Sequence, residues 1–261
     1  MPGKARLAFG FPDIHWATRD KTALSIATNA HRLLRPDLTI LGGDVWDCTP
    51  FSRFGRKSLE EMQNYQRTFC EVEMIPSLRW VNAIAAHTKR IVWLEGNHDA
   101  WLGRWVANAP CADRIGSELL RSPLRYMVDH EKKLEVVPWS NTNDRLSKFA
   151  LHPRLITCHG WCANKYAARK HLELSRSKSV IFHHTHRAQR EATRDPHTGD
   201  IIEAMSAGCL CKRQPIWQQG VPTDWVHGFW IAYLGRHTYT LFAVRIERGR
   251  AVLPDGREVG P

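Results

Sequence analysis

Short apolar runs alternate with amphipathic stretches along the first two thirds of the chain. The runs at 5–11 (ARLAFGF) and 38–42 (LTILG) flank ATRDKTALSIATNAHRLL, in which Ala, Leu and Ile recur at helical spacing. A second unit follows, in which a helical stretch from about 58 to 87, interrupted at Pro76, precedes the apolar run RIVWLEG. The pattern predicts successive β-α-β units.

The alternation continues to about residue 183 and then changes. Runs at 134–138 (LEVVP) and 154–158 (RLITC) precede the helical stretch NKYAARKHLELS, and SVIFH is typical of a further strand. This order favours an open, largely parallel sheet covered by helices. From about 188, QREATR and IIEAM flank the turn-forming DPHTGD, and WIAYLG, TLFAVRIE and AVLPDGREV are also β-like. We therefore expect one domain over 1–261, with an antiparallel C-terminal β part.

Charge and cysteine content narrow the class of protein. The 37 Lys and Arg residues exceed the 26 Asp and Glu residues by 11, a balance that attracts polyanions such as nucleic acid. Seven scattered cysteines do not form a secreted disulfide framework. The N-terminus has no signal-peptide pattern, and the apolar runs are too short to span a bilayer. We expect a cytoplasmic protein, with no membrane partner and with a homodimer as an option.

Five short segments place metal-competent residues directly after predicted strands. They are PDIH (12–15), GGD (42–44), GNHD (96–99), CHG (158–160) and HHTH (183–186). In an open α/β sheet, that edge is where ligands bind. Each segment alone is common in turns, but five in order indicate a shared site. Alternation in an extended chain would place Asp13 beside His15, and His184 beside His186.

The segments together supply seven nitrogen and oxygen donors. Seven are too many for one tetrahedral ion with an open position, but they suit two ions that share a bridging carboxylate. The mixture of imidazole and oxygen ligands suits Mn, Fe, Zn or Ni better than Mg alone. The candidate ligands are Asp13, His15, Asp44, Asn97, His159, His184 and His186.

The order D-x-H, G-D, G-N-H-D, H-G and x-H-x-H resembles the calcineurin-like metallophosphoesterase superfamily. The later part, with HGWCANKYAARKHLELSRSKSVIFHHTHR, GCLCKR and DWVHGFW, is similar to phage and prophage members. The resemblance implies a sandwich of two mixed β-sheets flanked by helices. It also implies two divalent ions per chain, Mn²⁺ foremost, with Fe, Zn or Ni as alternatives.

The resemblance further implies a role for each residue. Asp13, His15 and His186 would bind the first ion, Asn97, His159 and His184 the second, and Asp44 both. His98 would be the catalytic imidazole that stabilises the transition state or protonates the leaving oxygen, and Asp99 the carboxylate that orients it. Such an imidazole typically contributes about 10² to 10⁴ in rate.

The implied activity is hydrolysis of phosphodiester bonds, in nucleic acid or nucleotides, by in-line attack of a metal-bridging hydroxide. The same site would also suit a cyclic-nucleotide phosphodiesterase, a phosphomonoesterase or a protein phosphatase. A non-catalytic nucleic-acid-binding protein is the remaining alternative. Degenerate members of that kind are expected to lack ligands, whereas this chain has the full set.

Several further residues have two readings. Arg53 and Arg56, in the basic loop CTPFSRFGRK, are candidates for substrate phosphate contacts, although a solvated loop is the commoner outcome. Asp47 either supports Asp44 or caps a local segment. His183 stands where the family usually has Gly; substrate contact is one option, but packing or a hydrogen bond behind the ligands is favoured.

The cysteines and tryptophans are assigned to packing. The spacing of Cys158, Cys162, Cys209 and Cys211 matches no metal-binding pattern, and free Cys is usually buried. Tryptophans near the motifs are expected in the core or the cleft wall, with base stacking as the alternative. They are Trp16, Trp46, Trp101, Trp105 and Trp161.

Overall fold

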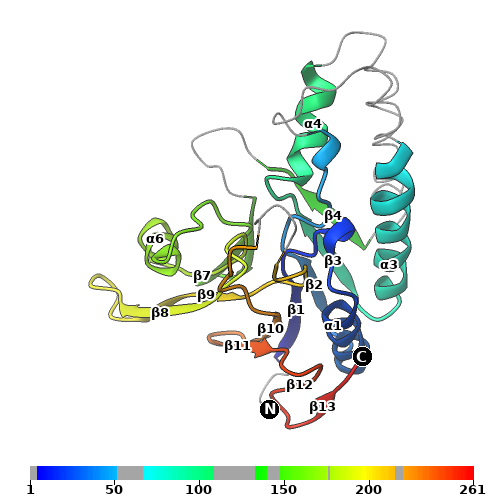
Figure 1. Ribbon diagram of the computed structural model, residues 1–261. Helices are drawn as coiled ribbons and strands as arrows, with labels where there is room; N and C mark the ends of the chain where they lie inside the picture. Colours follow the sequence, from blue (N-terminus) through cyan, green and yellow to red (C-terminus); the bar gives the residue numbers. More distant parts are fainter. Residues whose placement is uncertain (1–4, 52–66, 109–132, 140–146, 176, 215–219) are drawn as a thin grey trace.

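The computed structural model describes residues 5–51, 67–108, 133–139, 147–175, 177–214 and 220–261 (Figure 1). The described strands form two large sheets that face each other and one short ribbon. The first sheet has the order β11-β10-β1-β2-β3-β4, the second the order β5-β6-β7-β9-β8, and β12 pairs with β13.

Four parallel strands and an antiparallel pair build the first sheet. The parallel strands are β1 (Arg6–Phe11), β2 (Leu38–Leu41), β3 (Arg90–Leu94) and β4 (Leu134–Val137). On the other side of β1, β10 (Gly228–Leu234) and β11 (Tyr239–Arg245) pair antiparallel. The ribbon consists of β12 (Ala251–Val252) and β13 (Glu258–Val259). Strand β1 therefore joins the N-terminal and C-terminal parts of the chain.

The second sheet mixes both pairing directions. Strands β6 (Leu155–Cys158), β7 (Ser179–Phe182) and β9 (Ile201–Ala207) are parallel. The two edge strands, β5 (Lys148–His152) and β8 (Ala188–Arg194), pair antiparallel with β6 and β9. This sheet bears the second half of the candidate ligands.

Helices cover the outer face of each sheet (Figure 1). Beside the first sheet lie α1 (Lys21–Leu34), α3 (Ile75–Ala85) and α4 (Asp99–Asn108), and beside the second lies α6 (Ala167–Leu174). Shorter helical segments are η1 (Trp16–Thr18), η2 (Thr49–Phe51) and the π-helix η3 (Phe69–Met74). Contrary to expectation, the helical chain is not interrupted at Pro76: the π-helix η3 passes directly into α3, and Pro76 lies in the first turn of α3.

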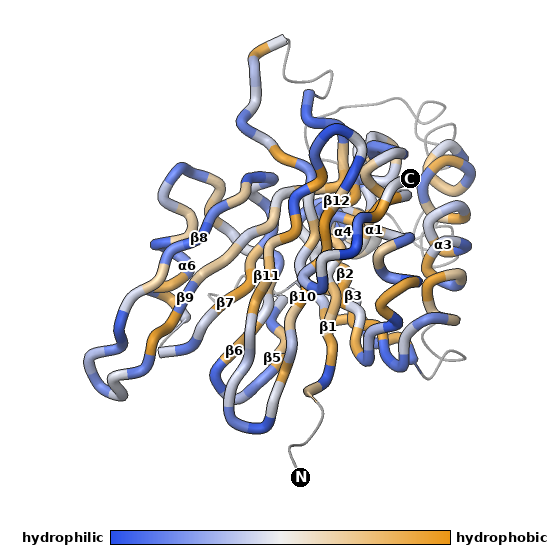
Figure 2. The backbone as a smooth tube through the Cα atoms, turned by 90° about the horizontal axis from the view of Figure 1, so that it is seen from below, coloured by the Kyte–Doolittle hydropathy of each residue, from blue (hydrophilic) through white to orange (hydrophobic). Residues whose placement is uncertain are grey.

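The core has three layers of apolar side chains. One cluster lies between the two sheets and includes Ile40, Val92, Ile181, Met205 and Trp230. A second fills the space under α1 and α3, and a third lies under α6. Figure 2 shows hydrophobic residues along inner strands such as β1, with hydrophilic residues at many of the turns.

The fold confirms the two-sheet sandwich implied by the resemblance and corrects the single open sheet implied by the alternation alone. Strand β5 was not predicted, and β10 and β11 return to the first sheet rather than forming a separate part. The part of the chain that the structure describes contains no helix long and apolar enough to cross a membrane.

Candidate metal centre

The five polar segments predicted from the sequence meet at one place. Each follows a parallel strand directly, after β1, β2 and β3 of the first sheet and after β6 and β7 of the second. Because the carboxyl ends of these strands converge, the two sheets bring residues 171 positions apart into contact: His15 Nε2 lies 3.3 Å from His186 Nε2.

The backbone of these segments is left-handed rather than extended. The φ angles are positive at Asp13 (34°), His15 (46°), Asp44 (48°), His184 (72°) and His186 (58°). Each such non-glycine residue typically costs about 1 to 3 kcal/mol and persists only where the surroundings enforce it. Alternation was therefore the wrong reason for pairing these residues, which converge because both segments turn sharply.

Two glycines make room for the ligands. A Cβ atom on Gly43, whose φ is 92°, would lie 2.3 Å from Nδ1 of His159, and one on Gly96 would lie 2.1 Å from Oδ1 of Asp44. The GGD and GNHD segments therefore need glycine because side chains of the site occupy the space beside the backbone.

One group of side chains gathers around His15. His186 Nε2 lies 3.6 Å from Asp13 Oδ1, and His15 Nε2 lies 3.7 Å from Asp44 Oδ2. Single donor atoms of Asp13, His15 and Asp44 all lie within 4.8 Å of one another. This spacing suits one ion, and it corresponds to the first of the two expected ligand sets.

A second group gathers around His159. Its Nε2 lies 3.1 Å from Asn97 Oδ1 and 3.2 Å from Asp44 Oδ2, and its ring centroid is 5.1 Å from that of His184. Donor atoms of Asp44, His159 and His184 likewise lie within 4.8 Å of one another. Asp44 belongs to both groups, which is the position expected of a bridging carboxylate.

The residues fit divalent cations. His184 Nδ1 is buried without a hydrogen-bond partner, an arrangement that is costly unless another ligand satisfies that nitrogen. Asp13 and Asp44 are 0% and 1% exposed, so two carboxylates share a site that water scarcely reaches. An unpaired buried polar atom beside buried carboxylates is the donor chemistry of a metal centre.

Three of the candidate ligands are imidazoles whose Nδ1 atoms contact an acceptor on the side away from the centre. Nδ1 of His15 lies 3.2 Å from Oδ1 of Asp47, and Nδ1 of His159 lies 2.9 Å from the Gly42 carbonyl oxygen. Nδ1 of His186 lies 3.7 Å from Sγ of Cys211. Acceptors at Nδ1 place the proton there and leave Nε2 free to bind a metal.

The electrostatics reflect the crowding of charges. Burial raises the pKa of Asp13 to about 7, with the carboxylate of Asp44 adding to the effect. Burial lowers the pKa of His15, but Asp47, Asp44 and Asp13 outweigh it and raise the pKa to about 10. For Asp44, burial is outweighed by His159 and His98, which hold the pKa well below its usual range. The pocket therefore favours positive charge at its centre.

His98 lies beside this centre in a position suited to act on a substrate. Its backbone N–H donates to Asp44 Oδ1 at 2.8 Å, and its Nδ1 lies 2.8 Å from the Asp47 carbonyl oxygen. Nδ1 therefore carries the proton of the neutral ring, and Nε2 is the atom available to a substrate. The ring packs against Trp101 at 4.1 Å and His15 at 4.8 Å between centroids.

Asp99 does not orient His98 as expected. Its carboxylate accepts hydrogen bonds from the backbone N–H groups of Trp46 (2.9 Å), Gly96 (3.0 Å) and Val45 (3.4 Å). It thereby ties the segments after β2 and β3 together, and the Asp47 carbonyl holds the His98 ring instead. Asp99 is a structural link in the site because its oxygens are used by the backbone.

His183 is also corrected, because it cannot contact a substrate. The side chain is 0% exposed, its Nδ1 lies 2.8 Å from the Cys158 carbonyl oxygen, and Trp230 Nε1 donates to its Nε2 at 3.0 Å. Burial lowers its pKa to about 3, so the ring is neutral. The favoured option, a hydrogen bond behind the ligands, describes its place.

Arg53 and Arg56 lie outside the described residues. Asp47, for which two roles were weighed, is 3% exposed and holds His15 and the backbone of η1, with its Oδ2 accepting from Ala17 N at 2.9 Å. Its position within GDVWD, three residues after Asp44, was the only sequence signal for this function.

Cys211 and two tryptophans were missed as neighbours of the site. Trp139 packs against His159 at 5.6 Å between centroids, and Trp225 against His186 at 4.0 Å. Trp139 follows β4, and Trp225 lies in the DWVHGFW segment before β10, for which no role at the site was predicted from the sequence. Only the spatial arrangement of the chain places Cys211 and the two tryptophans beside the ligands.

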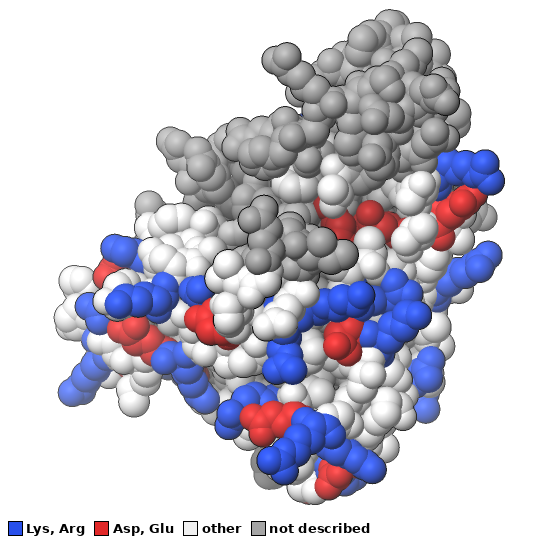
Figure 3. All heavy atoms as spheres, in the orientation of Figure 1, with Lys and Arg blue, Asp and Glu red and all other residues white. Residues whose placement is uncertain are grey.

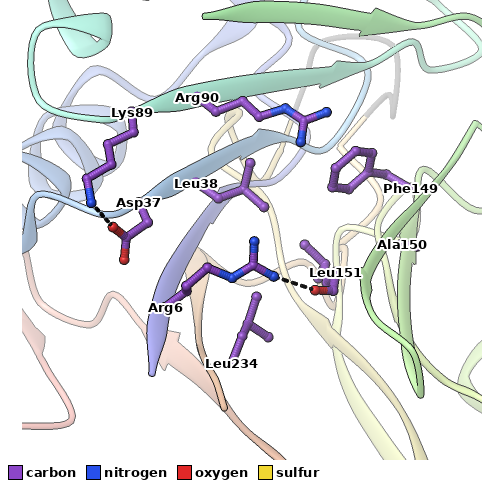
Figure 4. A pocket seen from close by; sticks show the side chains of 9 residues that line it. All are labelled: Arg6, Asp37, Leu38, Lys89, Arg90, Phe149, Ala150, Leu151 and Leu234. Carbon is purple, nitrogen blue, oxygen red and sulfur yellow. Dashed lines mark hydrogen bonds and ion pairs between the residues drawn. The ribbon is translucent and has the colours of Figure 1, made fainter. Parts of the chain in front are cut away.

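A cavity of about 330 Å³ lies at the opposite edge of the sandwich (Figure 4). Its lining includes Arg6, Asp37, Lys89 and Arg90, from the amino ends of β1 to β3. Lys89 Nζ is 2.6 Å from Asp37 Oδ1, and Arg90 pairs with Glu135. The cavity is remote from the candidate ligands and contains none of them.

Comparison with known proteins identifies the class. The sequence profile of the calcineurin-like phosphoesterases matches residues 10–207, which include all the candidate ligands. The chain therefore belongs to this family. Among curated proteins, none matches the sequence.

Several solved structures are similar to this chain, and one of them supports the same fold. Vacuolar protein sorting 29 from Cryptosporidium parvum aligns with 99% of this chain and 100% of its own, at 11% identity and a TM-score of 0.53. A phosphoesterase from E. coli, Yfce, covers 97% and 96% at 11% identity with a TM-score of 0.40. A dimetal phosphatase from Danio rerio covers 99% and 97% at 11% identity, also with a TM-score of 0.40. The first of these likenesses, at 11% identity, describes the fold alone.

Proposed function

We propose that the protein is a dinuclear-metal phosphodiesterase that acts on nucleic acid or nucleotides. The observation that supports it is the set of seven donors in two groups that share Asp44, with His98 next to them. Two divalent ions held by these groups would neutralise the phosphate and activate a water molecule at neutral pH. The left-handed backbone at five of these residues is strain of the kind that clusters at functional sites.

The protein residues have separable tasks in this proposal. Asp44 occupies the shared ligand position, and Asp47 fixes both His15, through its carboxylate, and His98, through its carbonyl oxygen. His98 Nε2 faces the substrate and, when protonated, can give a proton to the leaving oxygen. Burial lowers the pKa of His98, which favours release of that proton.

Two features favour a nucleic acid or nucleotide as substrate. The chain carries a formal charge of +11, and Figure 3 shows Lys and Arg spread over one face with acidic residues between them. Trp101, Trp139 and Trp225 are partly exposed and pack against His98, His159 and His186. Aromatic side chains beside a phosphate site can stack on bases.

A phosphomonoesterase or protein phosphatase is the second candidate, since the donor set itself is indifferent to what carries the phosphate. The test compares bis(p-nitrophenyl) phosphate with p-nitrophenyl phosphate after reconstitution with Mn²⁺, Fe²⁺, Zn²⁺ or Ni²⁺. A higher kcat/KM for the diester, followed by cleavage of single-stranded oligonucleotides, would support the proposal. Preference for the monoester would establish the second candidate instead.

Two controls make the comparison decisive. The first control is the variant His98→Ala, purified in parallel. Hydrolysis by the site should fall in this variant, whereas hydrolysis by a contaminating nuclease would persist. Metal content measured by mass spectrometry shows that the assayed protein is loaded. Loaded protein that hydrolyses neither ester and no oligonucleotide would contradict catalysis and favour a nucleic-acid-binding role.

A further inference from the structure

The thiol of Cys211 lies against a candidate ligand, although the sequence assigned it to packing. Its Sγ is 3.7 Å from His186 Nδ1, and the residue is 1% exposed. Single donor atoms of His15, His186 and Cys211 lie within 4.8 Å of one another. The sulfur therefore belongs to the surroundings of the first ligand group.

The backbone around Cys211 is fastened to the segment that bears Asp13. Leu210 N donates to the Asp13 carbonyl oxygen at 3.1 Å, and Lys212 N donates to that of Thr18 at 2.9 Å. His227 Nε2 lies 2.9 Å from the carbonyl oxygen of Cys211 itself. These bonds hold the thiol at a fixed place behind the His186 ring.

Three of the candidate ligand imidazoles each use a different acceptor at Nδ1. His15 has the Asp47 carboxylate, His159 has the Gly42 carbonyl, and His186 has the Cys211 sulfur. A metal can bind Nε2 only if that nitrogen is unprotonated, which requires the proton on Nδ1. The Nδ1–H of His186 must then donate, and the sulfur lone pair accepts.

We propose that Cys211 is a positioning residue for the first metal ion, which accepts the Nδ1–H bond of His186 and so keeps Nε2 directed at the ion. Trp225 confines the same ring, with centroids 4.0 Å apart at 72°. Sulfur is a weak acceptor compared with a carboxylate or a carbonyl oxygen. The orientation of His186 accordingly depends more on packing than that of His15 or His159, and removal of the thiol should loosen it.

The test measures metal binding rather than turnover. Apoprotein is titrated with Co²⁺, Zn²⁺ and Mn²⁺ against a competing chelator, and bound metal is counted per chain. Cys211→Ala should weaken one of the two ions by about 10- to 100-fold, the usual effect of removing a partner behind a ligating histidine. Cys211→Asn, whose side-chain carbonyl can accept the same N–H, should keep both ions within a few-fold of the native protein.

Cys162→Ala is the matched control. Cys162 is also buried, at 8% exposed, but it packs in the cluster under α6. Its replacement should leave both affinities unchanged. Circular dichroism of all variants identifies any loss of fold, and the Asn variant still tests the hydrogen bond if the Ala variant does not fold.

The near-ultraviolet spectrum of the Co²⁺ protein separates positioning from direct coordination. A hydrogen-bonding thiol gives no thiolate-to-cobalt charge-transfer band, whereas a sulfur ligand gives one. A band in the native protein that disappears in Cys211→Ala would overturn the proposal. So would equal loss of the ion in the Asn and Ala variants, or full retention of both ions in Cys211→Ala.

Discussion

Charged residues lie at both ends of the parallel strands in the first sheet, but their surroundings differ. At the carboxyl ends of β1 to β3, Asp13 and Asp44 are buried in a left-handed backbone. At the amino ends, Lys89 pairs with Asp37, and their side chains are 81% and 29% exposed. The cavity lies at the second edge, while the donors gather at the first.

This difference shows which features mark the functional edge. Solvent-exposed ion pairs contribute little to stability. A cavity between two sheets is likewise no sign of a functional site by itself. Buried carboxylates, an unpaired His184 nitrogen and strained backbone have a cost that the fold alone does not offset. These destabilising features therefore mark the functional edge. Substitutions at the two edges should differ sharply in their effects on metal binding and turnover.

The largest effect is expected for Asp44→Ala. The carboxylate belongs to both donor groups, so its loss should weaken the binding of both ions. It should also reduce turnover more than any other single change. Metal content per chain and kcat/KM for the diester measure the two effects. A variant that keeps two ions and native turnover would refute the bridging position.

His98→Ala should come next. The side chain is not a candidate ligand, so metal content should stay at the native level while turnover falls by about 10² to 10⁴. Single-turnover assays on protein of measured metal content separate this loss from a binding defect. Native turnover of a natural substrate by this variant would show that another group supplies the proton.

A smaller effect is expected in the scaffold, at His31 of α1. Burial lowers the pKa of His31 to about 3, and Nε2 lies 2.8 Å from Thr39 Oγ1. The unfolded state binds the proton near pH 6.5 and the folded state does not, so stability is complete above pH 6.5 and falls as the pH drops towards 3. One such group removes about 2 kcal/mol between pH 7 and pH 5.

The variant His31→Gln tests this contribution. Its amide can still donate to Thr39, but it has no proton to gain. Urea unfolding at pH 7 and pH 5 should therefore show a smaller decrease in stability for the variant than for the native protein. Identical decreases would mean that His31 is accessible to protons in the folded state.

Lys89→Ala should have the smallest effect and completes the comparison of edges. Loss of an exposed pair with Asp37 should change the free energy of unfolding by about 0.5 kcal/mol or less and leave metal content and turnover unchanged. Thermal unfolding and the diester assay measure both. A large decrease in turnover would show that the cavity edge takes part in the reaction.

The sequence predicted the contents of the site better than its geometry. Motifs after strands identify Asp13, Asp44 and Asn97 because parallel strands end at a common edge. The turn that brings His184 and His186 together is a backbone conformation, and strand periodicity does not predict it. Likewise, Asp99 was assigned by likeness, while its actual bonds depend on how two loops meet.

Residues that reach the site from distant segments could not be predicted. Cys211 and Trp225 follow the family match, which ends at residue 207, and their relation to His186 depends on how the chain returns after β9. The second sheet could not be predicted from the alternation of strands and helices either, because one sheet and two sheets give the same alternation. Assignments to phage-type members, manganese and a homodimer stay predictions.

The placement of β10 between β11 and β1 also concerns the order in which the protein is made. All seven donors have been synthesised by residue 186, yet β1 acquires its second neighbour only when residues 228–234 are synthesised. The same strand delivers Trp230, which donates to His183 directly beside the ligands. A nascent chain would therefore carry every donor before it has the pairing that fixes the first strand, so the centre matures late in synthesis and depends on contacts distant in sequence.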